Sequence, residues 1–226
     1  MDRESRSRVR SEKGARDRLI ALAETHPKWA LGFCDETWWS RFERPALHGW
    51  SEDGQPLRLV QQTPVKDDPD PKALAAYGML VRSKPSDARR GWEQRVWLRF
   101  VEGRPVSAIT THFLGWCCDK LAAEGKKALL LIWDNASWHK SKFVKDWIAA
   151  SHNRQVRETG LGVRIVVCFL PKKSPWLNPI EPMWIHGKRK VVEPDELLGA
   201  YELADRACGV FGCPHYEHLS IPQEVV

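Results

Sequence analysis

The stretch KALLLIWDNASWH, residues 127–139, decides the fold class. Its apolar residues 128–133 are continuous, as in a strand buried on both faces, and they end at a carboxylate, Asp134. Upstream, Thr110 or Thr111 is suited to cap a helix whose apolar residues keep helical spacing until Gly125 ends it. A helix followed by a fully buried strand is typical of an α/β protein.

The same alternation recurs on both sides of this stretch. A first buried strand is predicted over residues 29–34 and ends at Asp35, and further strands are predicted over 73–81, 94–101 and 163–170. A helical face at 143–148 is followed by a polar segment, 151–160, which we interpret as a surface loop. The prolines of LPKKSPWLNPIEPMW, residues 170–184, predict a loop that leads into a helix near Ile180, and a last amphipathic helix is expected over about 196–208.

Composition excludes several classes of protein. The 226 residues are 42% hydrophobic and 10% aromatic, which excludes a mostly disordered chain. No apolar run approaches the roughly 18 residues that cross a bilayer, and no apolar segment follows the charged N-terminus as in a secretory signal. The net charge of +6 weakly favours a polyanionic partner, and the six cysteines of a chain without an export signal predict reduced thiols.

Three carboxylates occupy positions where an α/β fold exposes chemistry. Asp35 and Asp134 follow apolar strands, and Glu181 begins a helix. If the two strands are neighbours, both aspartates face one crevice, where three carboxylates can hold one or two Mg²⁺ or Mn²⁺ ions for phosphoryl chemistry. The alternative is structural, because many aspartates that end a strand only cap the next helix.

The sequence motifs around these acids resemble those of a known protein family. FCDET (33–37), WDNASWH (133–139) and LPKKSPWLNPIEPMW resemble, in that order, the three catalytic boxes of mariner-superfamily DDE transposases, specifically the six-thirty family of bacterial insertion sequences. The resemblance covers about residues 29–190. It implies an RNase H-like fold, a mixed five-stranded sheet flanked by helices, in which Asp35, Asp134 and Glu181 are the catalytic and metal-binding acids.

The resemblance also implies an activity and its partners. The expected enzyme is a metal-dependent DNA endonuclease and strand transferase that uses Mg²⁺ or Mn²⁺, two ions in all, and acts on element ends and target DNA during transposition. A homodimer in the active complex and a bacterial cytoplasmic, nucleoid-associated location are expected with it. We divide the chain into a basic arm or truncated linker (1–25), the DDE catalytic domain (26–195), and a C-terminal helix and tail (196–226).

Three features depart from the family pattern. Lys172 and Lys173 stand where the third box usually has an aromatic residue. Forty-six residues separate Asp134 from Glu181, more than usual, and we place the surplus in the predicted loop 151–160. No helix-turn-helix region precedes residue 20, so a separately encoded DNA-binding half is expected. The rival readings are an inactive remnant that binds nucleic acid without cutting it and a general RNase H-like repair nuclease.

Residues near the acids have functional and structural interpretations. Asn135, His139 and Asn178 are candidate supporting residues, although the first two are of types that often make only local hydrogen bonds. Glu36 is expected to point away from Asp35 and to have a structural role. A basic rim that contacts DNA, or a merely solvated basic face, is formed by Lys172, Lys173, Lys188, Arg189 and Lys190.

Other candidates are weaker. The four tryptophans that flank the boxes could stack on bases, but core packing is the expected role of Trp133, Trp138, Trp176 and Trp184. Within CGVFGCPHYEH, residues 208–218, a zinc site is a minor option at Cys208, Cys213, His215 and His218, because the spacing matches no common zinc finger. Asp67, Asp68 and Asp70 lie among prolines and are expected in an exposed loop.

Overall fold

The computed structural model describes residues 3–42, 49–50, 56–57, 66–84, 91–172, 174–191 and 198–221. Its centre is a mixed five-stranded sheet in the order β5-β4-β1-β6-β7. β1 is antiparallel to β4 and parallel to β6, while β4–β5 is antiparallel and β6–β7 is parallel. The strands are β1 (Trp29–Ser40), β4 (Ala73–Ser83), β5 (Glu93–Val101), β6 (Ala128–Trp133) and β7 (Arg164–Phe169); β2 (Gly49–Trp50) and β3 (Pro56–Leu57) form a separate two-stranded ladder.

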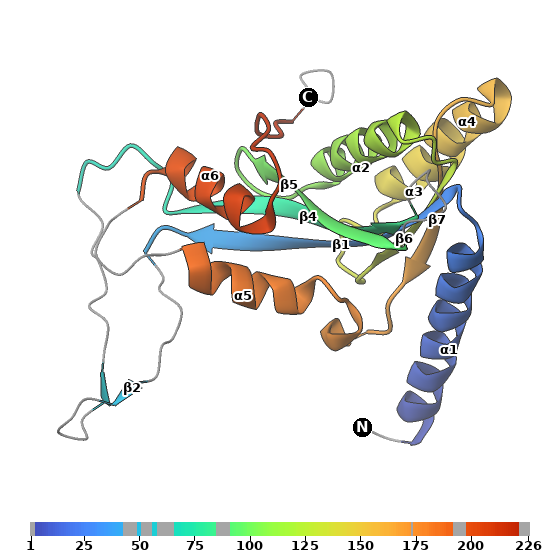
Figure 1. The fold of residues 1–226 in the computed structure, drawn as a ribbon, viewed down its shortest axis with the longest axis horizontal. Helices are drawn as coiled ribbons and strands as arrows, with labels where there is room; N and C mark the ends of the chain where they lie inside the picture. Colours follow the sequence, from blue (N-terminus) through green and yellow to red (C-terminus); the bar gives the residue numbers. More distant parts are fainter. Residues whose placement is uncertain are drawn as a thin grey trace.

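Helices cover both faces of the sheet (Figure 1). One face packs against α1 (Arg3–Thr25), α5 (Glu181–Val191) and α6 (Ala200–Phe211). The other packs against α2 (Ser107–Ala123), α3 (Lys142–Asp146) and the π-helical turn η1 (Trp147–His152). α4 (Asn153–Thr159) continues η1, and the 3₁₀ turn η2 (Pro175–Leu177) precedes α5. Among the described helices, none is long and apolar enough to cross a membrane.

Alternation along β1 divides the core in two. Phe33 and Trp39 belong to the buried cluster under α5 and α6, whereas Cys34 belongs to the cluster under α2. Because successive side chains of a strand point to opposite faces, Asp35 faces the α5 side and Glu36 faces the α2 side. The side chains of these two neighbouring acids therefore lie on opposite faces of the sheet.

β1 does not end at Asp35, as the sequence predicted, but continues to Ser40. The extension is stabilised by β4, which pairs with β1 from Ala30 to Ser40 and sets Asp35 opposite Gly78. On its other side β1 pairs with β6 only as far as Phe33, opposite Ile132. Two residues further along each strand, Asp35 and Asp134 occupy matching positions where β6 has ended, so the sheet opens there.

The polar segment 151–160 is not a loop. It is helical as far as Thr159, in η1 and α4. The buried side chain of Asn153 explains its attachment: its Nδ2 donates to the carbonyl of Ile165 and its Oδ1 accepts from the Ile165 N–H of β7, both at 2.8 Å. The extra residues between the second and third boxes therefore extend a helix that is bonded to the edge strand.

The aspartate-proline segment is also more ordered than expected. The buried guanidinium of Arg41, directly after β1, lies 2.8 Å from Asp68, and Asp70 Oδ2 accepts from the N–H of Ala200 at the start of α6. The backbone N–H of Asp70 and the Arg41 guanidinium together lower the pKa of Asp68. The predicted last helix begins at Ala200 rather than at residue 196, and residues 192–197 lie outside the described part of the chain.

Candidate functional site

The three predicted acids come from three different elements around the open end of β6. Asp35 lies within β1, Asp134 directly follows β6, and Glu181 is the first residue of α5. Beside them is a pocket of about 330 Å³ whose polar and charged lining residues include Asp134, Asn135, Lys140, Lys172, Asn178 and Glu181. The structure thus brings residues from all three sequence boxes to one place.

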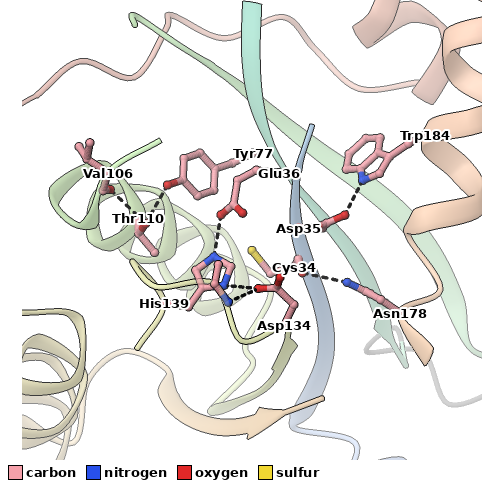
Figure 2. A network of polar contacts seen from close by, with 11 residues as sticks. Cys34, Asp35, Glu36, Tyr77, Val106, Thr110, Asp134, His139, Asn178 and Trp184 are labelled. Carbon is pink, nitrogen blue, oxygen red and sulfur yellow. Dashed lines mark hydrogen bonds and ion pairs between the residues drawn. The ribbon is translucent and has the colours of Figure 1, made fainter. Parts of the chain in front are cut away.

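Asp35 is partly buried beside α5. Its Oδ2 accepts a hydrogen bond of 2.9 Å from Trp184 Nε1 (Figure 2). Burial, followed by repulsion from Glu181, raises the pKa of Asp35 to about 7 despite that hydrogen bond. The indole of Trp184 lies against β4 at Gly78, where a Cβ atom would come within 2.1 Å of the ring. Glycine at this position therefore makes room for the tryptophan that holds Asp35.

Glu181 shares the unfavourable electrostatics of Asp35. Burial, and then repulsion from Asp134, raises the pKa of Glu181, and Lys188 two turns along α5 opposes the shift. Glu181 sits at the positive end of α5, and its N–H donates to the carbonyl of Asn178. Asp35 and Glu181 together form a pair of carboxylates whose charges the surrounding protein does not fully neutralise.

Asp134 has a different environment, because its Oδ1 accepts two hydrogen bonds. One comes from the N–H of Ala136 at 2.9 Å and the other from His139 Nδ1 at 2.8 Å. Burial opposes ionisation of Asp134, but these hydrogen bonds outweigh it and lower its pKa. The side chain of Asp134 is still 52% exposed, so it is held in place while it remains open to solvent.

His139 joins Asp134 to Glu36. Its Nε2 lies 2.8 Å from Glu36 Oε1, its ring is fully buried, and it stacks on Trp133 with centroids 4.3 Å apart. Burial would lower the pKa of His139, but the hydrogen bonds to Asp134 and Glu36 raise it to about 9. Figure 2 shows Glu36 on one side of β1 and Asp35 on the other, with Asp134 reached from the side of Glu36.

Two asparagines connect the boxes to one another. Asn135, in the second box, donates to the carbonyl of Leu170 at the start of the third. Asn178, in the third box, donates at 3.1 Å to the carbonyl of Cys34 in the first. His139, in the second box, joins Glu36 in the first. Each pair of boxes is therefore joined by one of the predicted supporting residues. Their backbone and side-chain contacts hold the three acids in a fixed frame.

The comparison with protein families matches this arrangement. Residues 92–197 match the family model described as DDE superfamily endonuclease. The match includes Asp134 and Glu181, whereas Asp35 precedes it. No curated protein matches the sequence.

Solved structures similar to this chain extend the comparison to the whole sheet. They include the Mos1 strand transfer complex, with a TM-score of 0.58 and 11% identity, and the Mos1 mariner paired-end complex with Mn, with a TM-score of 0.57 and 12% identity. A Mos1 transposase paired-end complex with the left transposon end matches with a TM-score of 0.54. Each match covers 95% of this chain, which spans 56% of the other. At such low identity the likeness concerns the fold, and it confirms the RNase H-like architecture.

The predicted basic rim divides into two places. Lys172 is exposed and lines the pocket, whereas Lys188, Arg189 and Lys190 form the last turn of α5. Lys173 lies outside the described residues. The pocket also contains Lys140, which the sequence analysis did not select. Its position six residues after Asp134, at the end of the second box, was the available signal.

The four tryptophans near the three acids differ from one another. Trp133 and Trp184 are buried, as predicted, and Trp138 is half-buried. Trp176 in η2 is 65% exposed, so the prediction of a core role is wrong for it. Pro175 begins this short 3₁₀ turn and Pro179 follows it, so Trp176 lies outside the longer helices and the strands of the sheet.

The zinc option near the C-terminus is not supported. Nε2 of His215 and Nε2 of His218 lie 3.3 Å apart, but the thiol of Cys213 donates to the carbonyl of Cys208 within the end of α6, and Cys208 is buried. Among the described residues, no group of three His, Cys, Asp or Glu side chains is close enough to hold a metal ion, and this applies equally to Asp35, Asp134 and Glu181.

Proposed function

We propose that this chain is the catalytic part of a DDE transposase, which cleaves DNA strands at the ends of a mobile element and transfers them to target DNA with the help of Mg²⁺ or Mn²⁺. One observation carries the proposal: Asp35, Asp134 and Glu181 come from β1, the end of β6 and the start of α5 and surround the open end of the sheet. The DDE family match and the Mos1-like fold support it.

The donor groups suit a hard divalent cation. Carboxylate and amide oxygens are the ligands such ions prefer. The raised pKa values of Asp35 and Glu181 reflect burial and carboxylate repulsion, which a cation would relieve. Asn178 lines the same pocket, and its buried Oδ1 has no hydrogen-bond partner among the described residues. Asp35, Asp134 and Glu181 would draw closer together to hold one or two ions, which would activate the attacking oxygen and stabilise the leaving oxygen of an in-line displacement.

The protein's own residues would orient the DNA and the acids. His139 fixes Asp134, and Trp184 fixes Asp35. Lys140 and Lys172 lie in the pocket with Asp134 and Glu181, where ammonium groups suit DNA phosphates, and the last turn of α5 offers further basic residues. On this proposal the partners are element ends and target DNA in the bacterial cytoplasm. A homodimer and a helix-turn-helix DNA-binding half complete the assembly.

The test is metal-dependent nicking of a supercoiled plasmid that carries the gene's own flanking DNA. We expect the wild type to nick the plasmid in Mn²⁺ but not in EDTA. The Asp134→Asn variant should still bind DNA but should not nick it. Asp146→Asn, an exposed aspartate on α3, is the matched control and should nick like the wild type. DNA binding without metal-dependent nicking by the wild type would favour the inactive remnant instead.

A further inference from the structure

We propose that Glu36 is a positioning residue of the DDE site, which holds the ring of His139 so that Nδ1 donates to Asp134 Oδ1. This inference rests on the proposed function, because it concerns the same acid. It assigns a role to a side chain that lies on the opposite face of β1 from Asp35. Glu36 therefore acts on the site through His139 rather than by contact with metal or DNA.

The contacts form a continuous chain. Glu36 Oε1 and His139 Nε2 are 2.8 Å apart, and His139 Nδ1 and Asp134 Oδ1 are also 2.8 Å apart. The ring of His139 is fully buried and the side chain of Glu36 is only 8% exposed. Solvent therefore has little access to replace either hydrogen bond, and the partners of the ring are set by the protein.

Stacking on Trp133 does not by itself fix the histidine. The two rings are inclined by only 10°, which sets the plane of the imidazole. A half-turn about the Cβ–Cγ bond keeps that plane but exchanges Nδ1 with a carbon, and Nε2 with the other carbon. Only the hydrogen bonds distinguish the two orientations. The hydrogen bond that Nε2 donates to Glu36 favours the orientation in which Nδ1 also donates to Asp134.

Glu36 is itself placed by regular structure. It lies opposite Tyr77 of β4 in the antiparallel register. The Tyr77 hydroxyl is 2.7 Å from that of Thr110, which donates at 3.1 Å to the carbonyl of Val106 at the start of α2 (Figure 2). Burial, followed by the nearby charge of Glu36, raises the pKa of Tyr77. The register of β1 with β4 and the contact of Tyr77 with the first turn of α2 therefore place Glu36 on the face of the sheet that α2 covers.

The experiment compares two substitutions of similar length. Glu36→Gln keeps an amide that can accept from or donate to Nε2, whereas Glu36→Met fills the space without a hydrogen bond. We expect Glu36→Met to lower kcat of Mn²⁺-dependent nicking by about 10- to 100-fold, as is usual for residues that orient metal ligands, with KM for the plasmid unchanged. Glu36→Gln should stay close to the wild-type rate. Glu24→Met, at an exposed glutamate of α1, is the control.

Asp134→Asn, assayed in parallel, separates the two proposals. If Asp134→Asn still nicks, the proposed function fails. If it is inactive but Glu36→Met matches the wild type, or if Gln and Met are equally impaired, the positioning role alone is overturned. Should Glu36→Met not fold, ¹⁵N NMR of histidine-labelled wild-type protein decides: the account requires both ring N–H protons of His139 to be protected from exchange, and an unprotected Nε2 proton overturns it.

Discussion

The two faces of β1 at Asp35 and Glu36 have opposite electrostatic characters. On the α5 face, Asp35 and Glu181 are carboxylates with raised pKa values, held near one another by Trp184 and the start of the helix. On the α2 face, Glu36 and Asp134 are both bonded to one buried histidine. Two adjacent residues of one strand thus belong to two different environments: the carboxylate charge of Asp35 is not neutralised, whereas that of Glu36 is paired with a histidine.

On the proposed function, this difference indicates how the fold accommodates a cation site without losing its stability. The repelling carboxylates on the α5 face are suited to attract a cation, at a cost to the folded state. The Glu36–His139–Asp134 chain compensates by fixing one acid through a buried network. Removal of a charge should therefore have opposite effects on stability at the two faces.

The largest effect is expected on the α2 face. His139→Leu leaves Glu36 without its cationic partner in a buried position, and breaking such a buried pair costs roughly 3–5 kcal/mol. Urea denaturation at pH 7 measures the loss. His112→Leu, at an exposed histidine of α2, is the control and should change stability little. A His139→Leu protein as stable as the wild type would contradict the view of this face as a satisfied network.

The next effect tests the packing that holds Asp35. In Gly78→Ala the new methyl group meets Cη2 and Cζ2 of the Trp184 ring at 2.1 and 2.5 Å, so the indole must shift away from Asp35. Overpacking of this kind costs about 1–3 kcal/mol, and nicking should fall with it. Gly209→Ala in α6, where no heavy atom lies within 4 Å of the added Cβ, should instead stabilise the protein by up to about 1 kcal/mol. Thermal unfolding of both variants distinguishes crowding at Trp184 from a general effect of alanine.

A smaller effect, with the opposite sign, is expected on the α5 face. Asp35 has a pKa of about 7 in the folded protein and roughly 3.9 in an unfolded chain. Ionisation of Asp35 is therefore less favourable in the folded state, and the protein loses stability as the pH rises from about 4 to about 7. Asp35→Asn, which still accepts from Trp184, should therefore raise stability by on the order of 1 kcal/mol at pH 8 and by less at pH 5. Urea denaturation at the two pH values measures this gain, and a loss at pH 8 would contradict the assignment of repulsion to Asp35.

Much of this site could be predicted from local sequence, because each box pairs a strand or turn signal with its acid. Asp134 ends an uninterrupted apolar run, and the prolines before Glu181 fix where α5 begins. The end of β1 was predicted wrongly, because residues 35–40 are partly polar and only their pairing with β4 keeps them extended. The local hydrophobic pattern of the sequence does not predict which strand a segment pairs with.

The role of Glu36 was not available from sequence for a similar reason. Its direction away from Asp35 follows from strand geometry and was predicted correctly. Its partner His139 is 103 residues away and comes from the turn after another strand. The helical segment 151–159 was missed because its exposed face is polar, while the contacts of Asn153 with β7 are again long-range.

The most direct test of the central claim, that Asp35, Asp134 and Glu181 form a divalent-cation site, is the pH dependence of Mn²⁺ binding measured by calorimetry between pH 5.5 and 8. Asp35 must lose its proton to bind a cation, so affinity should rise about tenfold per pH unit below pH 7 and level off above it. Asp35→Asn should bind weakly at every pH. Wild-type protein that binds no Mn²⁺ at pH 8, or that binds it no more tightly than Asp35→Asn, would contradict the account.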